Sequence, residues 1–207
     1  MWNAHTGDEY GFGRYARAGT LAVDSYRAAS DRHRRARVEA YDAARNDVIA
    51  NLGIGSELRL ADIDAAAMAE WERSWARRKH PRGVGGWNWP ELVRALPRRA
   101  AVLPMAVWYG SDLCGLALGQ ASRSRAGGLR HTFTLTFVER RPEPPPVPLR
   151  GLITALAVDV AENYGRALGA TRLVLRNPDP NLLSYYELQG FATVRTLQEP
   201  LHCLKEI

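Results

Sequence analysis

Three consecutive stretches rich in β-forming residues, between residues 102 and 138, constrain the fold of this chain most strongly. The first two, Val102–Tyr109 and residues 113–121, are joined by Gly110-Ser111-Asp112, a short connection typical of a β-hairpin. The third, residues 130–138, alternates threonine with phenylalanine and leucine and follows a polar, glycine-containing turn. We therefore predict that the three stretches are neighbouring strands of one sheet.

Helical segments surround these strands. Residues 57–62 alternate like a short strand, and aspartates then precede a helix at 65–78 and a shorter one at 87–96. After a proline-rich loop, a long helix is expected from Leu149 or Arg150 to Leu168, with Gly169 at its end. A strand at 171–176, a short helix at 180–188 and strands at 191–196 and 201–204 complete the order β-α-α-β-β-β-α-β-α-β-β. We predict an α/β fold with one mixed central sheet.

The N-terminal quarter of the chain has a different pattern. Apolar residues recur at three- and four-residue steps, which predicts a helix from about residue 15 to residue 50. We expect residues 1–54 to be a helical N-terminal extension and residues 55–207 to be the main domain. The basic cluster at residues 32–37 is typical of a solvated helix face. A nucleic-acid interface is the alternative.

The composition is that of an ordinary soluble protein. Of its 207 residues 46% are hydrophobic and 24% are charged, and no apolar run approaches the roughly 18 residues that a membrane-spanning helix needs. No signal peptide is recognisable in the first residues, and Cys114 and Cys203 have the apolar surroundings of buried, reduced thiols. A cytoplasmic location is therefore expected. The net charge of +6 comes almost entirely from arginine, which codon bias on a solvated surface explains better than nucleic-acid binding does.

Most familiar catalytic motifs are absent. The chain has no H-E-x-x-H, G-x-S-x-G or Walker sequence, and its five histidines have no metal-ligand spacing, so no metal site is expected. The informative region is the start of the long helix, Arg150-Gly151-Leu152-Ile153-Thr154-Ala155. Free N–H groups and the positive end of a helix dipole bind anions such as a diphosphate, and Arg150 adds positive charge.

A second motif lies further along the chain. The ending Tyr186-Glu187-x-x-Gly190-Phe191 resembles the YExxGF motif of the GNAT superfamily of acetyl-CoA-dependent N-acetyltransferases. The element order from residue 57 onward and the hairpin at 106–119 also resemble that fold. The resemblance covers residues 57–207, whereas residues 1–54 fall outside it.

The resemblance implies a fold, a cofactor and candidate site residues. The family's diphosphate loop reads R-x-x-G-x-G/A, with which Arg150, Gly151, Thr154 and Ala155 are compatible, while Ile153 replaces the usual middle glycine. The acetyl-CoA arm would lie between the fourth and fifth strands. The implied cofactor-binding residues are Phe137, Val138, Arg150, Gly151, Leu152, Ile153, Thr154, Ala155 and Asn177, the last of which would alternatively cap the short helix together with Asp179.

The resemblance also implies catalytic roles. Tyr186 matches the tyrosine that protonates the leaving thiolate, and Tyr185 is expected to pack. Glu139, at the end of the fourth strand, is the best candidate for a general base, with a solvated loop glutamate as the alternative. Four tryptophans, Trp71, Trp75, Trp87 and Trp89, would pack the first helix pair of the domain onto the sheet or hold the acceptor.

These observations favour one function over two others. The favoured one is transfer of acetyl from acetyl-CoA to an amine acceptor, which is a small molecule, a protein amine or an aminoacyl-RNA, by direct attack in a ternary complex. The alternatives are a catalytically inactive fold that binds CoA or a protein partner, and an RNA-associated protein that uses the arginine-rich helix. A homodimer remains open.

Overall fold

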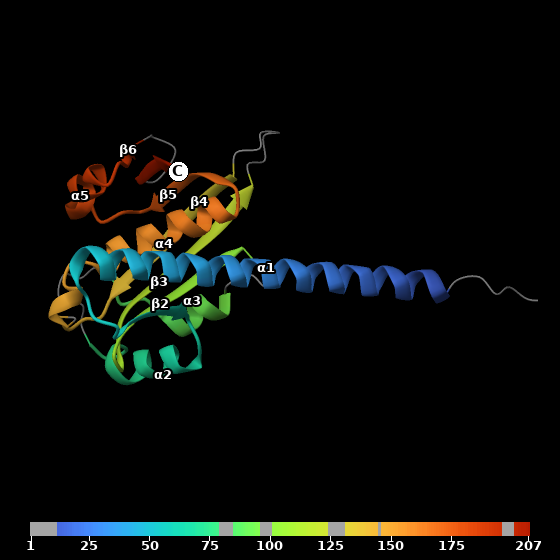
Figure 1. The fold of residues 1–207 in the computed structure, drawn as a ribbon, viewed down its shortest axis with the longest axis horizontal. Coiled ribbons are helices and arrows are strands. Elements are labelled where there is room, and N and C mark those ends of the chain that lie inside the picture. The colour runs from blue at the N-terminus through green and yellow to red at the C-terminus, as the bar shows by residue number, and fades with distance from the viewer. Residues whose placement is uncertain (1–11, 79–84, 96–100, 124–130, 145, 196–200) are drawn as a thin grey trace, which may run out of the picture.

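The computed structural model describes residues 12–78, 85–95, 101–123, 131–144, 146–195 and 201–207 (Figure 1). Its helices are α1 (Phe12–Leu52), α2 (Ala65–Ser74), α3 (Trp89–Ala95), α4 (Ile153–Ala167) and α5 (Leu183–Leu188), with 3₁₀ turns at Val147–Leu149 and Pro180–Leu182. Its strands are β1 (Leu58–Asp62), β2 (Val102–Tyr109), β3 (Asp112–Arg123), β4 (His131–Arg140), β5 (Ala170–Arg176), β6 (Ala192–Val194) and β7 (His202–Glu206). The predicted order of elements is confirmed.

The seven strands form one sheet in the order β1-β2-β3-β4-β5-β7-β6. All neighbours are antiparallel except β4 and β5, which are parallel because α4 connects them across one face of the sheet. The mixed sheet predicted from the sequence is therefore confirmed.

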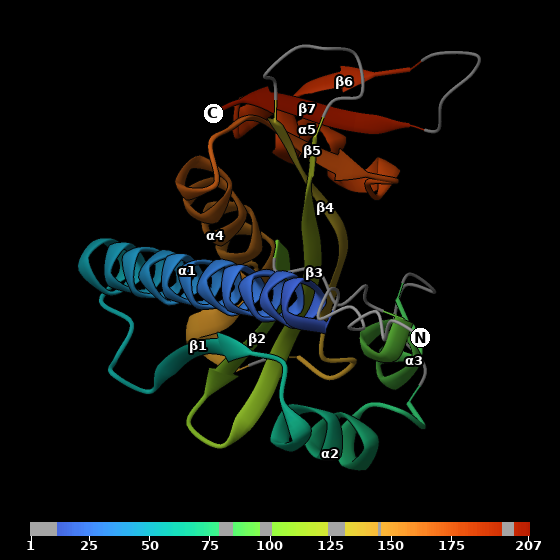
Figure 2. The same ribbon diagram turned by 90° about the vertical axis from the view of Figure 1, so that its right-hand side faces the viewer.

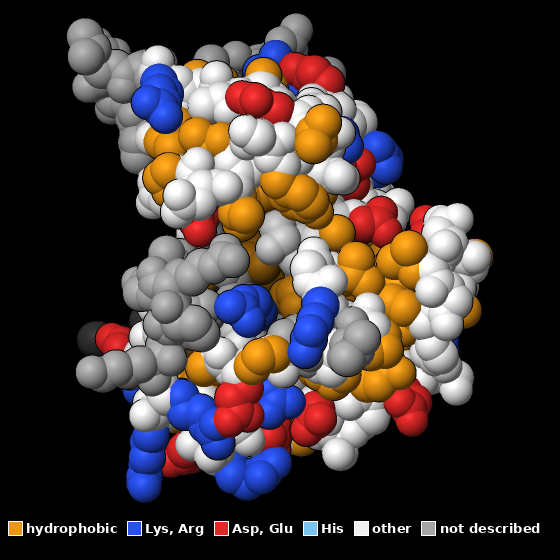
Figure 3. Space-filling view, turned by 90° about the vertical axis from the view of Figure 1, so that its left-hand side faces the viewer, with side chains coloured by type: hydrophobic (Ala, Val, Ile, Leu, Met, Phe, Trp, Pro, Cys, Tyr) orange, Lys and Arg blue, Asp and Glu red, His pale blue; other side chains and the backbone are white. Residues whose placement is uncertain are grey.

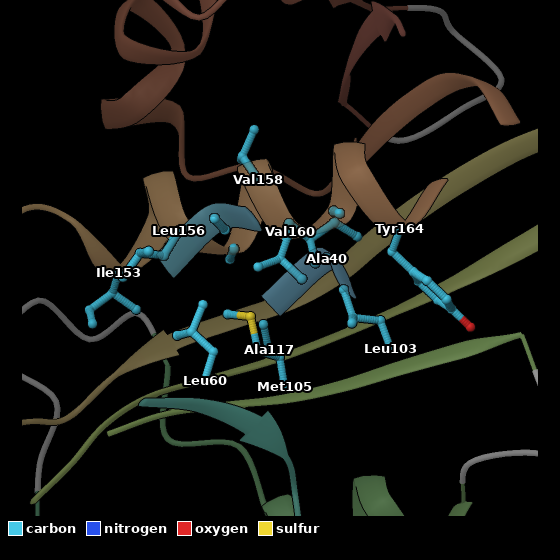
Figure 4. Packing of buried hydrophobic residues seen from close by; sticks show 14 of the residues in the cluster. Ala40, Leu60, Leu103, Met105, Ala117, Ile153, Leu156, Val158, Val160 and Tyr164 are labelled. Carbon is cyan, nitrogen blue, oxygen red and sulfur yellow. The ribbon is translucent and has the colours of Figure 1, made fainter. Parts of the chain in front are cut away.

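Helices cover both faces of the sheet (Figure 2). On one face α1 and α4 pack over a large hydrophobic core, to which α4 contributes Ile153, Leu156, Val160 and Tyr164 (Figure 4). On the opposite face α2 and α3 pack through Trp75 and Trp89, both buried, onto Trp108 and leucines of β3. Trp75 and Trp89 therefore pack this helix pair onto the sheet, one of the two roles considered for the tryptophans.

The C-terminal half of α1 is part of the main core. Ala40, Tyr41 and Ala44 are buried there, and Arg37 forms a bidentate ion pair with Asp62 of β1. The N-terminal half of the helix extends beyond the rest of the molecule (Figure 1). The division at residues 54 and 55 stays a prediction.

Two irregularities in β4 shape the site. Pairing of β4 with β5 extends only from His131 to Leu135, so the two strands separate toward their carboxyl ends. On the other side, Gly119 pairs with Leu135 and Leu118 with Phe137, which leaves Thr136 as the extra residue of a β-bulge. No helix in the described ranges has the length and hydropathy needed to cross a membrane.

Candidate active site

A cavity of about 1400 Å³ lies where β4 and β5 separate. Its walls come from the second half of β4, the start of α4, the segment after β5, the helix α5 and the residues before α3. Figure 3 views the molecule from the side to which these strand ends point, and hydrophobic side chains gather there in a hollow flanked by basic side chains. Ligands of open α/β sheets commonly bind at the carboxyl ends of separating strands.

The bulge at Thr136 determines which side chains face which half of the cavity. Successive residues of a strand point to opposite faces, and one inserted residue reverses the alternation beyond it. Phe133 and Leu135 accordingly belong to the core under α1 and α4. Phe137 instead packs with the buried tryptophans under α2 and α3. The cavity therefore passes through the gap in the sheet from the α4 face to the α3 face.

The helix α4 begins at Ile153, later than the sequence predicted. Gly151 has a φ of 78°, a left-handed conformation that favours glycine and is not that of an α-helix. The helix therefore begins after this residue. No side chain caps this helix terminus, so the N–H groups of its first turn are available to a ligand. Arg150 is exposed at the same edge of the cavity. The arrangement is suited to bind an anion.

Ile153 replaces the glycine of the family motif without filling the cavity. Its side chain is only 4% exposed and lies in the core, where a Cβ added at Gly115 of β3 would be 2.5 Å from Ile153 Cγ2. Its branched side chain packs against the sheet at Gly115, and the residue also lines the cavity.

Tyr186, in α5, lines the same cavity as the start of α4. The residue is buried, and its ring packs edge-on against Tyr185 and Phe191. Among the described residues, no hydrogen-bond partner is found for its hydroxyl. Burial raises the pKa of Tyr186 to about 12, with smaller contributions from Cys203, Asp179 and Tyr185. The phenol is therefore protonated at neutral pH and can donate to a group bound in the cavity.

Glu139, at the end of β4, lines the same cavity and is buried, with only 4% of the residue exposed. One carboxylate oxygen accepts a hydrogen bond of 2.5 Å from the backbone N–H of Gly86, and the other accepts from the indole N–H of Trp89. Glu139 is thus not a solvated loop residue. It ties the end of β4 to the segment that leads into α3.

Most of the residues predicted for the site line this single cavity. They are Phe137, Val138, Glu139, Arg150, Gly151, Ile153, Thr154, Asn177 and Tyr186. Leu152 instead lines a separate, smaller cavity of about 510 Å³ beside the end of α1, and Ala155 lines neither. Tyr185, expected only to pack, also lines the main cavity.

Asn177 and Asp179 follow β5, and from the sequence either could bind the cofactor or cap the short helix. The structure gives them different positions. Asp179 caps the 3₁₀ turn by accepting from the N–H of Asn181 at 2.9 Å. Asn177 instead adopts a φ of 49°, donates its N–H to Leu201 and lines the cavity. Its conformation suits a sharp turn directly after the strand.

Sequence reasoning missed several wall residues, namely Leu135, Thr136, Val158, Leu175, Arg176, Pro178 and Leu182. The parallel arrangement of β4 and β5 could have identified these wall residues. The carboxyl ends of two parallel strands lie at the same edge of a sheet, so the residues that end both strands face the same gap. Val158 also points away from the sheet in Figure 4, unlike the α4 residues labelled around it. Within the described ranges, no cluster of three His, Cys, Asp or Glu side chains could hold a metal ion.

Comparison with known proteins shows the fold. No family model matches the chain, and no curated protein matches it. An acetyltransferase from Streptococcus agalactiae 2603 matches with a TM-score of 0.53 and 14% identity, over 74% of this chain and all of that one. A transcriptional regulator from Bacillus halodurans C-125 matches with a TM-score of 0.52 and 15% identity, over 67% and 95%. A chain of the KacTA–DNA complex matches with a TM-score of 0.52 and 14% identity, over 72% and 92%.

The chain therefore has the GNAT acetyltransferase fold. The resemblance stated from the Tyr186–Phe191 motif and the element order is confirmed for the fold. At these identities the activity has to be argued from the site itself.

Proposed function

We propose that the protein is an acyltransferase that moves an acetyl group from acetyl-CoA to an amine. The observation that supports this most directly is that one cavity brings together an uncapped helix start, a gap between two strands and a protonated tyrosine. The helix start suits a diphosphate, the gap suits an extended arm, and the tyrosine can donate a proton. Acetyl-CoA contains a diphosphate and an extended arm, and transfer of its acetyl group releases a thiolate that takes up a proton.

The residues around the gap fit the cofactor. The first-turn N–H groups of α4 and the guanidinium of Arg150 would hold the diphosphate, because they place partial and full positive charge at one edge of the cavity. Beyond Leu135 the edge of β4 that faces β5 is unpaired, so Phe137 and Val138 would offer backbone groups to the amides of the arm. When bound, acetyl-CoA supplies the thioester that the amine attacks.

Two side chains would manage the protons. Tyr186 would donate its phenolic proton to the leaving sulfur, since a phenol is protonated at neutral pH. Glu139, in the wall nearer α3, would accept the proton of the amine, directly or through water. Each carboxylate oxygen that accepts one hydrogen bond has a second lone pair available.

Calorimetric titration with acetyl-CoA tests the proposal. We expect micromolar binding by the wild type and its loss in Arg150→Glu, with Arg35→Glu as the matched charge reversal on the exposed surface of α1. Failure of the folded wild type to bind millimolar acetyl-CoA would contradict the proposal. Binding without transfer to any amine would instead support the inactive CoA-binding alternative.

A further inference from the structure

The segment Gly85–Trp89, which leads into α3, places an aromatic side chain in the cavity wall. Trp87 lines the cavity and packs edge-on against Phe137 of β4, with ring centroids 5.3 Å apart. It also packs edge-on against Trp89, at 6.4 Å. Trp87 therefore lies on the α3 side of the gap, across the sheet from the start of α4.

Glu139 holds this segment in place. It accepts hydrogen bonds from the residues on either side of Trp87, namely from the backbone of Gly86 and from the indole of Trp89. Gly85 and Gly86 have φ values of 103° and 79°, which residues with a side chain rarely adopt. Two glycines and a buried carboxylate thus determine the position of the Trp87 ring.

Phe137 is an aromatic neighbour of Trp87 in this wall, and Gly85 and Glu139 line the same cavity. A buried anion favours a cationic amine, and the aromatic faces favour an apolar group attached next to it. A small polar amine would leave this surface uncovered.

We propose that Trp87 is a specificity-determining residue that selects amines with an aromatic or large apolar group beside the amino group. The inference rests on the proposed function, since it assigns the α3 side of the cavity to the acceptor. Glu139 acts here as a positioning residue for Trp87, in addition to any role in proton transfer.

Binding of two simple amines tests this. 2-Phenylethylamine and ethanolamine carry the same amino group on the same two-carbon spacing but differ in the apolar ring. Each is titrated into the protein by calorimetry, with and without CoA, and is assayed as acceptor with acetyl-CoA. We expect the wild type to favour 2-phenylethylamine about tenfold or more, the discrimination typical of an apolar pocket.

Trp87→Ala should abolish that preference by weakening 2-phenylethylamine binding and raising its KM, with the acetyl-CoA affinity unchanged. Trp87→Phe keeps an aromatic edge against Phe137 and should retain part of the preference. Leu188→Ala, which removes a large side chain that is 85% exposed on α5, is the matched control and should behave as the wild type.

The outcomes separate the two proposals. Equal affinities of the wild type and Trp87→Ala for 2-phenylethylamine overturn the inference about Trp87, even if acetyl-CoA binds. Absence of acetyl-CoA binding overturns the proposed function, whereas a Trp87-dependent affinity for the aromatic amine would still show that this wall is an aromatic amine site.

Discussion

The side chain of Ile153 occupies the space that a Cβ at Gly115 would need, with only 2.5 Å between that Cβ and Ile153 Cγ2. The two residues lie on different elements, the first turn of α4 and the strand β3, and are 38 positions apart in the sequence. The absence of a side chain at one position therefore accommodates the β-branched residue at the other. Ile153 can replace the motif glycine because Gly115 is small.

Gly115→Ala should consequently lower the free energy of unfolding by about 1–3 kcal/mol, because the new methyl group overpacks a buried contact. In an Ile153→Ala background the same change should cost much less, since the clashing Cγ2 is gone. Urea denaturation of the four proteins of this cycle measures the coupling. Additive effects of the two substitutions would contradict the packing described here.

Tyr186→Phe should lower kcat by about 100-fold or more if the phenol protonates the leaving thiolate, with little change in acetyl-CoA affinity. Tyr185→Phe is the matched control, because it removes the hydroxyl of the neighbouring tyrosine in the same cavity. Steady-state kinetics with calorimetry of acetyl-CoA binding distinguish the two variants. Equal kcat values for both variants would exclude Tyr186 as the proton donor.

Alkaline pH should destabilise the folded protein. Burial raises the pKa of Tyr186 to about 12 and that of Cys114 to about 11, and it raises the pKa of Tyr41 well above its usual value. The folded state thus holds these protons more tightly than the unfolded state does. The stabilisation is complete below the unfolded pKa values, near 9 for the thiol and 10 for the phenols, and is lost as pH rises through the folded values.

Denaturation by urea between pH 8 and pH 11 checks this prediction. Above the unfolded pKa, each such group lowers the free energy of unfolding by at most about 1.4 kcal/mol per pH unit. Tyr41→Phe and Tyr186→Phe should each reduce the slope, since they remove one titrating phenol. A free energy of unfolding that is constant up to pH 11 would show that these groups titrate alike in both states.

The order of helices and strands could be predicted from the sequence because it depends on local periodicity and turns. The motif around Tyr186 likewise identified one wall of the cavity. The sequence did not reveal the bulge at Thr136, because a bulge is defined by pairing with another strand, and it decides that Phe137 packs on the α3 face. The late start of α4 and the fit of Ile153 against Gly115 depend in the same way on backbone conformation and contacts between distant segments.

Glu139→Gln should lower the free energy of unfolding by about 1–3 kcal/mol. The amide keeps one oxygen acceptor, but its NH₂ group faces one of the two donors, which is then left unpaired. Both Glu139→Gln and Trp89→Phe should raise the KM for 2-phenylethylamine, because each removes one hydrogen bond that positions the segment around Trp87.

The same pair of variants tests proton transfer. Only Glu139→Gln removes the carboxylate, so only this variant should lose the general base and lower kcat. Steady-state kinetics of the two variants make the comparison. Equal kcat values for both variants would show that Glu139 has only the positioning role.

The helix α1 should be indispensable in its C-terminal half and dispensable in its N-terminal part. Tyr41 is buried and donates a hydrogen bond of 2.9 Å to Asp62, so Tyr41→Phe should cost about 1.5–3 kcal/mol, the range for a bond to a charged group. Val38→Ala, on the exposed side of the same helix, should stay within about 0.5 kcal/mol of the wild type.

Two deletions extend this test to the proposed division of the chain. Deletion of residues 1–26 should leave the melting temperature nearly unchanged, because the N-terminal half of α1 extends beyond the rest of the molecule (Figure 1). Deletion of residues 1–54 removes Ala40, Tyr41, Ala44 and Ile54 from the core and should prevent cooperative folding. A cooperatively folded 55–207 fragment with the stability of the full chain would show instead that the boundary at residue 55 separates an independent domain from an added helix.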